Sequence, residues 1–129
     1  MKKKIFSTLF LLAGFFITLG AFGHSFGGVQ QVIDALAIPQ VPTRIANLII
    51  AVWHFAGLCM VMFGIIIFWH WLRIRRGENV HLFAPFAISI FYVSYGVAAI
   101  TFLNDPFFSV FVVLGGLLFI STLAIRNCE

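Results

Sequence analysis

Four long apolar runs are the feature that most limits what this chain can fold into. They cover residues 5–29, 45–72, 82–103 and 107–125. Each run reaches or approaches the roughly 20 residues that a helix needs to cross about 30 Å of hydrocarbon. Inside lipid, a helix satisfies its own backbone hydrogen bonds. The sequence therefore predicts an all-α fold, a four-transmembrane-helix bundle that forms a single integral membrane domain over residues 1–129.

The composition agrees with a membrane setting. Of the 129 residues, 62% are hydrophobic and only 9% are charged, whereas globular domains carry about 25% charged residues. The net charge of +4 comes from basic clusters at the ends of the apolar runs. Such clusters orient a chain in a bilayer, which excludes a nucleic-acid partner and leaves the lipid bilayer as the expected one.

The breaks between the runs carry helix-end signals. Pro42 precedes Thr43, which is a suitable N-cap for the second helix, and Asp105 precedes Pro106 in the same way before the fourth. Between the second and third runs lies a charged turn that contains Gly77. The second run of 28 residues is about 42 Å long as a helix, so it must tilt or project beyond the bilayer.

The distribution of basic residues predicts the orientation. Residues 2–4, the turn at 73–76 and Arg126 fall on one side of a four-pass arrangement, whereas the loops at 30–43 and 104–105 hold almost no Lys or Arg. Both the N and C termini should therefore be cytoplasmic. The expected location is the bacterial cytoplasmic (inner) membrane, as a multi-pass protein.

A cleaved signal peptide is the alternative interpretation of the first run. Three lysines, a long apolar stretch and Ala21-Phe22-Gly23 resemble such a peptide with small residues at the cleavage site. Cleavage there would leave three spans and a mature chain that starts at His24. The length of the run favours a membrane span.

Small and polar residues recur at helical spacing and predict where helices meet. In the first run the shared face holds Gly14, Thr18, Ala21, Ser25 and Gly28, and in the second Thr43, Asn47, His54, Gly57 and Gly64. Faces of this kind let membrane helices approach closely, so both should face other helices. Gly23 and Gly27 add a G-x-x-x-G pair.

Residues 23–28, GHSFGG, fit the G-x-S-x-G pattern of a serine hydrolase. That motif needs a strand before the serine and a helix after it, with an acidic residue and then a histidine later in the chain. Here the stretch continues a membrane helix, and the later histidines lie in or beside other spans. We therefore expect no catalytic residue and no enzymatic activity.

His24, His54 and Tyr92 are the candidate site residues. His24 should lie near the outer boundary of the membrane, and His54 about 16 Å into the second helix, where ionisable groups are rare. Either histidine could be a packing residue, with His54 bonded to Tyr92 or a nearby group. Alternatively, His24 and His54 could ligate haem b, with Tyr92 beside them.

Other metals fit the spacing less well. Cys59 lies about 140° around the helix from His54, so a copper or zinc site is not expected. A transporter or channel is a further alternative, and it is weakened because none of the four carboxylates is expected within the membrane.

Two stretches resemble a known group of proteins. Residues 21–27, AFGHSFG, and residues 51–55, AVWHF, are similar to small four-helix bacterial integral membrane proteins of unknown function. Those proteins carry a histidine late in the first helix and a Trp-His in the second. The resemblance implies a bacterial integral membrane protein and no particular activity.

Together these features predict a non-enzymatic multi-pass membrane protein without a cofactor. We expect it to be a self-associating or accessory subunit, as a homo-oligomer or within a larger membrane complex, with His24 and His54 in its outer half. A His-ligated haem or redox subunit is the alternative, and a small transporter or channel is the third.

Overall fold

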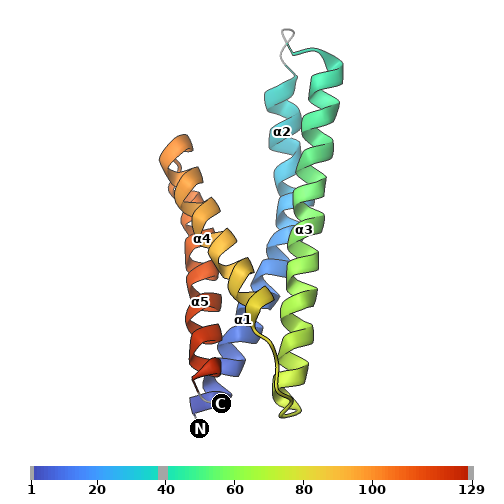
Figure 1. The fold of residues 1–129 in the computed structure, drawn as a ribbon. Helices are drawn as coiled ribbons and strands as arrows, with labels where there is room; N and C mark the ends of the chain where they lie inside the picture. Colours follow the sequence, from blue (N-terminus) through green and yellow to red (C-terminus); the bar gives the residue numbers. More distant parts are fainter. Residues whose placement is uncertain (1, 38–40, 128–129) are drawn as a thin grey trace.

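The computed structural model describes residues 2–37 and 41–127, which are helical over most of their length (Figure 1). The elements are α1 (Lys2–Phe22), the π-helical segment η1 (Gly23–Gly28), α2 (Val29–Leu36), α3 (Thr43–Arg75), α4 (Phe83–Leu103), the short 3-10 helix η2 (Pro106–Phe108) and α5 (Ser109–Arg126). Four helical runs, Lys3–Leu36, Thr43–Arg75, Phe83–Leu103 and Pro106–Arg126, are long and apolar enough to cross a membrane. The predicted all-α fold with four candidate spans is confirmed.

The helices form two hairpins. The first hairpin consists of α1, η1 and α2 packed against α3, and the second of α4 packed against α5. The hairpins are joined mainly by α1 against α5, and α3 makes much less contact with α4. They lie together at the end of the molecule that holds both termini and separate toward the other end (Figure 1).

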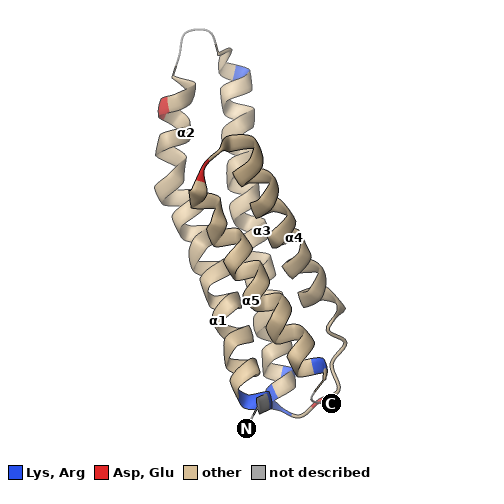
Figure 2. Ribbon diagram, turned by 90° about the vertical axis from the view of Figure 1, so that its left-hand side faces the viewer, with Lys and Arg blue, Asp and Glu red and all other residues tan. Residues whose placement is uncertain are grey.

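Most Lys and Arg residues lie at the end of the bundle that holds both termini (Figure 2). The turn from α3 to α4 is closed there by Arg73, whose Nε donates to Oε2 of Glu78 over 2.6 Å. Gly77 in this turn has φ +72°, a left-handed conformation that glycine adopts without steric cost. The Arg75 guanidinium lies 5.1 Å from the centroid of the Trp71 ring, a cation–π contact.

Glycines set the close approach of α1 to α3, as the small-residue faces predicted. A Cβ atom added to Gly57 would fall on the hydroxyl of Ser25, and one added to Gly64 would fall on the hydroxyl of Thr18. One added to Gly14 would lie 2.6 Å from Cγ2 of Ile67. The backbones also come close, since a Cβ on Gly64 would lie 3.2 Å from the Gly14 carbonyl oxygen and one on Gly57 would lie 3.6 Å from the Ala21 carbonyl oxygen.

Glycines also allow α4 and α5 of the second hairpin to pack closely. A Cβ atom on Gly115 of α5 would lie 2.8 Å from Cβ of Tyr92 and 2.9 Å from the Ser89 carbonyl oxygen on α4. On the facing helix, a Cβ on Gly96 would lie 2.8 Å from Cγ2 of Val112. Each helix of this hairpin therefore receives the other at a glycine.

The apolar core is concentrated in the half of the bundle nearest the termini. Its fully buried members are Phe10, Ala13 and Ile17 from α1, Ile67 from α3, and Leu118 and Ile125 from α5. Many large apolar side chains are exposed, and they occur on all four spans. Such a surface fits a bilayer, where lipid rather than water surrounds the helices.

Two predicted boundaries were wrong. The first helical run does not end near residue 29 but continues through α2 to Leu36, because Gln30, Gln31 and Asp34 lower the hydropathy without interrupting the helix. Thr43 is the first residue of α3 and not its N-cap, and the cap position is held by Pro42, which has no side-chain capping bond. The other N-cap was predicted correctly, since Oδ1 of Asp105 accepts from the Phe107 amide over 2.9 Å.

The two hairpins differ in length. The helical runs of the first have 34 and 33 residues, and those of the second have 21 each. At 1.5 Å per residue these are about 50 Å and about 31 Å. The second hairpin matches the hydrocarbon thickness of a bilayer and the first exceeds it.

Alanine substitution at two adjacent glycines of α5 tests the packing of the second hairpin. Gly115→Ala should lower the free energy of unfolding by about 1–3 kcal/mol, because the new methyl group overlaps the backbone of α4. Gly116→Ala is the matched control, since nothing lies within 4 Å of a Cβ there, and it should be neutral or stabilising by up to about 1 kcal/mol. SDS titration in mixed micelles, followed by circular dichroism, measures both. Equal effects would contradict the α4–α5 contact.

Candidate functional site

His24 and Trp53 hold the first hairpin together by a reciprocal contact. Nε2 of His24 lies 3.0 Å from the Trp53 carbonyl oxygen, and Nε1 of Trp53 donates to the His24 carbonyl oxygen over 2.8 Å. The two rings stack with centroids 4.0 Å apart and planes 13° from parallel. Because a carbonyl oxygen only accepts, Nε2 of His24 carries the proton in this arrangement.

The π-helical segment η1 coincides with the sequence GHSFGG. π-Helical turns are rare and occur frequently at functional sites. Gly28 makes room for the indole here, since a Cβ on it would lie 2.8 Å from Cζ2 of Trp53. Ser25 lies within this helical segment and packs on Gly57. The serine therefore has a helix on both sides, unlike the strand and helix that flank a hydrolase nucleophile.

His54 does not face the other helices, and this expectation was wrong. Its side chain is exposed on α3, although Gly57 and Gly64 of the same predicted face are buried. Successive residues of a helix point about 100° apart. Since Trp53 turns its indole to η1, the following residue turns away. Of the two candidate histidines, only His24 lies between the hairpins.

Tyr92 lies at the centre of the bundle on α4 and is 2% exposed. The ring of Phe111 is 5.6 Å away and that of Phe63 is 6.3 Å away, measured between centroids. Its hydroxyl oxygen is buried and has no hydrogen-bond partner among the described residues. Leaving a buried hydroxyl unpaired costs about 1–3 kcal/mol.

Two cavities between the hairpins bring His24 and Tyr92 together. The first, of about 230 Å³, is lined mainly by α3 and α4, and the second, of about 310 Å³, mainly by α1 and α5. Four residues line both cavities: His24, Met60, Tyr92 and Phe111. We call this pair the interhairpin cavities. His54 lines neither of them.

The described residues offer little for a metal or haem. They contain no group of three or more His, Cys, Asp or Glu side chains that could hold a metal ion. Haem b ligation by His24 and His54 would require the His24 ring to leave Trp53 and the exposed His54 to turn inward. The geometry therefore does not favour haem over a packing role for these two residues.

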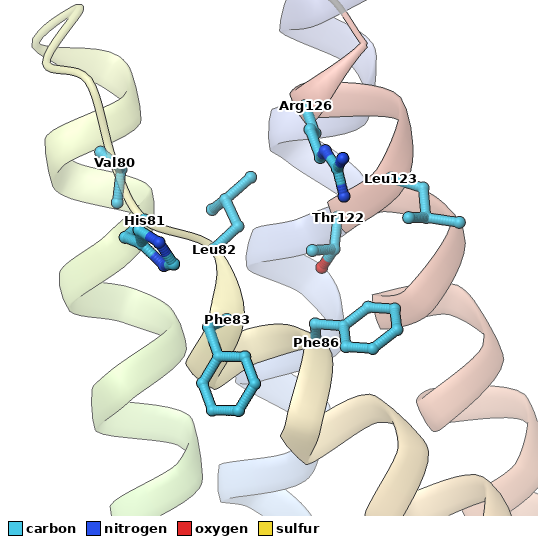
Figure 3. Close-up of a pocket in the computed structure, with 8 residues that line it drawn as sticks. All are labelled: Val80, His81, Leu82, Phe83, Phe86, Thr122, Leu123 and Arg126. Atoms are coloured by element: carbon cyan, nitrogen blue, oxygen red, sulfur yellow. The ribbon is translucent and has the colours of Figure 1, made fainter.

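A further cavity lies at the end that holds the termini (Figure 3). It has about 510 Å³ and is lined by Val80, His81, Leu82, Phe83, Phe86, Thr122, Leu123 and Arg126. The His81 and Arg126 side chains project into it from opposite sides, from the segment before α4 and from α5 (Figure 3). Its place among the basic residues suits an interface with lipid headgroups.

The chain matches no family model, no curated protein and no solved structure in comparisons with known proteins. The resemblance to small bacterial membrane proteins is thus supported only as far as the four long apolar helices.

Sequence reasoning found His24 and Tyr92 but missed Trp53 and Met60. The indole of Trp53 offered a signal, because a buried Trp N–H usually finds a partner. The sequence offered no such signal for Met60, because its contact with the cavities depends on where α1 lies beside α3. Its Cε would be 3.2 Å from a Cβ on Gly20.

Replacing Trp53 tests the contact with His24. Trp53→Phe should lower the free energy of unfolding by about 1–3 kcal/mol, because it removes the hydrogen bond to the His24 carbonyl and reduces the ring stacking. Trp69→Phe is the matched control, since Trp69 is 58% exposed and should change stability by less than about 0.5 kcal/mol. SDS titration in mixed micelles compares them. A Trp53→Phe protein as stable as the control would contradict the contact.

Proposed function

We propose that this protein is a non-enzymatic multi-pass protein of the bacterial cytoplasmic membrane that acts as a self-associating or accessory subunit of a membrane complex. The membrane setting follows from the four long apolar helices. The proposal for self-association is carried by one observation, the uncovered glycine pair of η1.

Most helical glycines of the chain are occupied by a neighbouring helix. An added Cβ would meet another residue at Gly14, Gly20, Gly28, Gly57, Gly64, Gly96 and Gly115. At Gly23 and Gly27 no atom of the described residues lies within 4 Å of an added Cβ. These two glycines are four residues apart, so they lie on the same side of η1. The backbone of η1 is therefore open on that side. Small residues at this spacing are a common dimerisation face of membrane helices.

A ridge lies beside this glycine face. Phe22 and Phe26 stack with ring centroids 6.3 Å apart and are 53% and 76% exposed. The ridge of Phe22 and Phe26 next to the glycine face is self-complementary, because the ridge of one copy can pack against the glycine face of another about a two-fold axis. This arrangement supports a homo-oligomer more than contact with lipid alone.

Substitution at Gly27 tests self-association. Gly27→Leu should reduce the protein mass measured in detergent micelles by light scattering to that of one chain, because the side chain covers the glycine face. Gly116→Leu is the matched control, since Gly116 is equally open but has no small residue four positions away, and it should keep the wild-type mass. A wild-type protein that is already monomeric, or a Gly27→Leu protein of unchanged mass, would reject this interface.

The cytoplasmic location of both termini is part of the proposal. It is supported by the distribution of Lys and Arg residues, most of which lie at the end of the bundle that holds the termini (Figure 2). Positive residues are retained on the cytoplasmic side of bacterial membrane proteins.

Reporter fusions test this orientation. Green fluorescent protein fused after the last residue should fluoresce in a bacterial host, and alkaline phosphatase fused there should be inactive. Alkaline phosphatase fused after Asn104, between α4 and η2, should be active. The opposite pattern would overturn the orientation and leave the helical fold untouched.

A further inference from the structure

The two hairpins separate toward the end away from the termini (Figure 1), and residues of both hairpins line the interhairpin cavities. Because one cavity is lined mainly by α3 and α4 and the other mainly by α1 and α5, they flank a shared set of residues between the hairpins. His24, Met60, Tyr92 and Phe111 belong to both. A molecule dissolved in the bilayer would reach these residues from the side, between helices.

The hydroxyl of Tyr92 is the one buried side-chain polar atom of the described residues without a partner. The other buried hydroxyl groups bond to carbonyl oxygens of their own helices: Ser89 to Phe86 over 2.6 Å, Ser121 to Leu117 over 2.8 Å and Thr122 to Leu118 over 2.6 Å. A tyrosine hydroxyl stands at the end of a ring and is held away from its own backbone. A molecule that enters the cavities can supply the missing partner.

The lining residues restrict the chemistry of that partner. Neither cavity is lined by Lys, Arg, Asp or Glu, so a charged headgroup would find no counter-ion. The cavity between α3 and α4 has aromatic walls from Phe55, Phe63, Phe91, Tyr92, Tyr95 and Phe111. Walls of this kind favour a neutral molecule with a flat ring.

We propose that the interhairpin cavities bind a neutral membrane-dissolved molecule of the prenylated quinone class. A carbonyl oxygen of its ring accepts the hydrogen bond of the Tyr92 hydroxyl, and the isoprenoid tail extends into the lipid between α3 and α4. An apolar cavity of about 150 Å³ can hold one benzene molecule, so about 230 Å³ is enough for a single substituted ring. Met60, which lines both cavities, has a flexible thioether that can move to make room. The inference concerns binding alone and does not depend on self-association.

Photolabelling tests the proposal on the full chain in lipid nanodiscs. The probe is an azido derivative of ubiquinone-2, with unlabelled ubiquinone-2 as competitor and mass spectrometry to locate the label. Saturable labelling of peptides that contain residues 52–63 or 91–95 is the expected result. Labelling that never saturates, or that spreads over the lipid-facing surface, would overturn the proposal.

Variants at single hydroxyl groups test whether the Tyr92 hydroxyl contacts the quinone. Tyr92→Phe removes only the hydroxyl and should weaken competition by ubiquinone-2 about tenfold, the effect of one buried hydrogen bond. Without quinone, the same variant should unfold at an unchanged or higher temperature, because an unpaired buried group has been removed. Thr101→Val is the matched control, since it also removes one hydroxyl from α4 but lines neither cavity, and it should compete as the wild type does.

Two more measurements make the result decisive. Ala56 lines the cavity between α3 and α4, so Ala56→Trp should fill it and abolish saturable labelling. A neutral diacylglycerol also carries carbonyl oxygens but no ring, and it should not compete. Wild-type labelling of the Ala56→Trp protein would overturn the placement of the site, and competition by diacylglycerol as strong as that of ubiquinone-2 would overturn the quinone assignment.

Discussion

The close approach of α1 to α3 at Gly14, Gly57 and Gly64 is the contact on which the rest of the structure depends. In lipid, helices gain nothing from hiding apolar surface, because the surrounding chains are equally apolar. Association therefore rests on van der Waals contact between closely packed helices, and a Cβ atom at Gly57 or Gly64 would meet the Ser25 or Thr18 hydroxyl of α1 and η1. The hairpin they form carries the His24–Trp53 contact, and its α1 also packs against α5.

The contrast between the two halves of the bundle follows from how the hairpins meet. Phe10, Ile67 and Leu118 are fully buried in the half near the termini. Toward the other end the hairpins separate (Figure 1). Residues of both hairpins line the interhairpin cavities. Tyr92 lies at the transition, where its ring is packed but its hydroxyl has no partner.

The spans were predictable from the sequence because length and hydropathy alone specify them. The facing of Gly14, Gly57 and Gly64 was also predictable, since a helix places residues three, four and seven apart on one side. The side that His54 faces was not predictable in this way. On a helix, His54 lies only about 60° from Gly57, and the position of the neighbouring helix decides which of the two residues is covered. The cavities could not be predicted either, because they arise from an angle between hairpins that no local pattern encodes.

The unequal length of the hairpins has a consequence for what can reach the protein from the far side of the membrane. Even at a tilt of 40°, near the upper end of the range for membrane helices, a helix of about 50 Å spans about 38 Å along the bilayer normal, more than the hydrocarbon thickness. The tip formed by α2 and the start of α3 therefore stands in or above the headgroup layer. It carries Gln30, Gln31, Asp34 and Arg44, which suit that wetter setting. A macromolecule in the aqueous phase on that side would reach this tip without entering the hydrocarbon region.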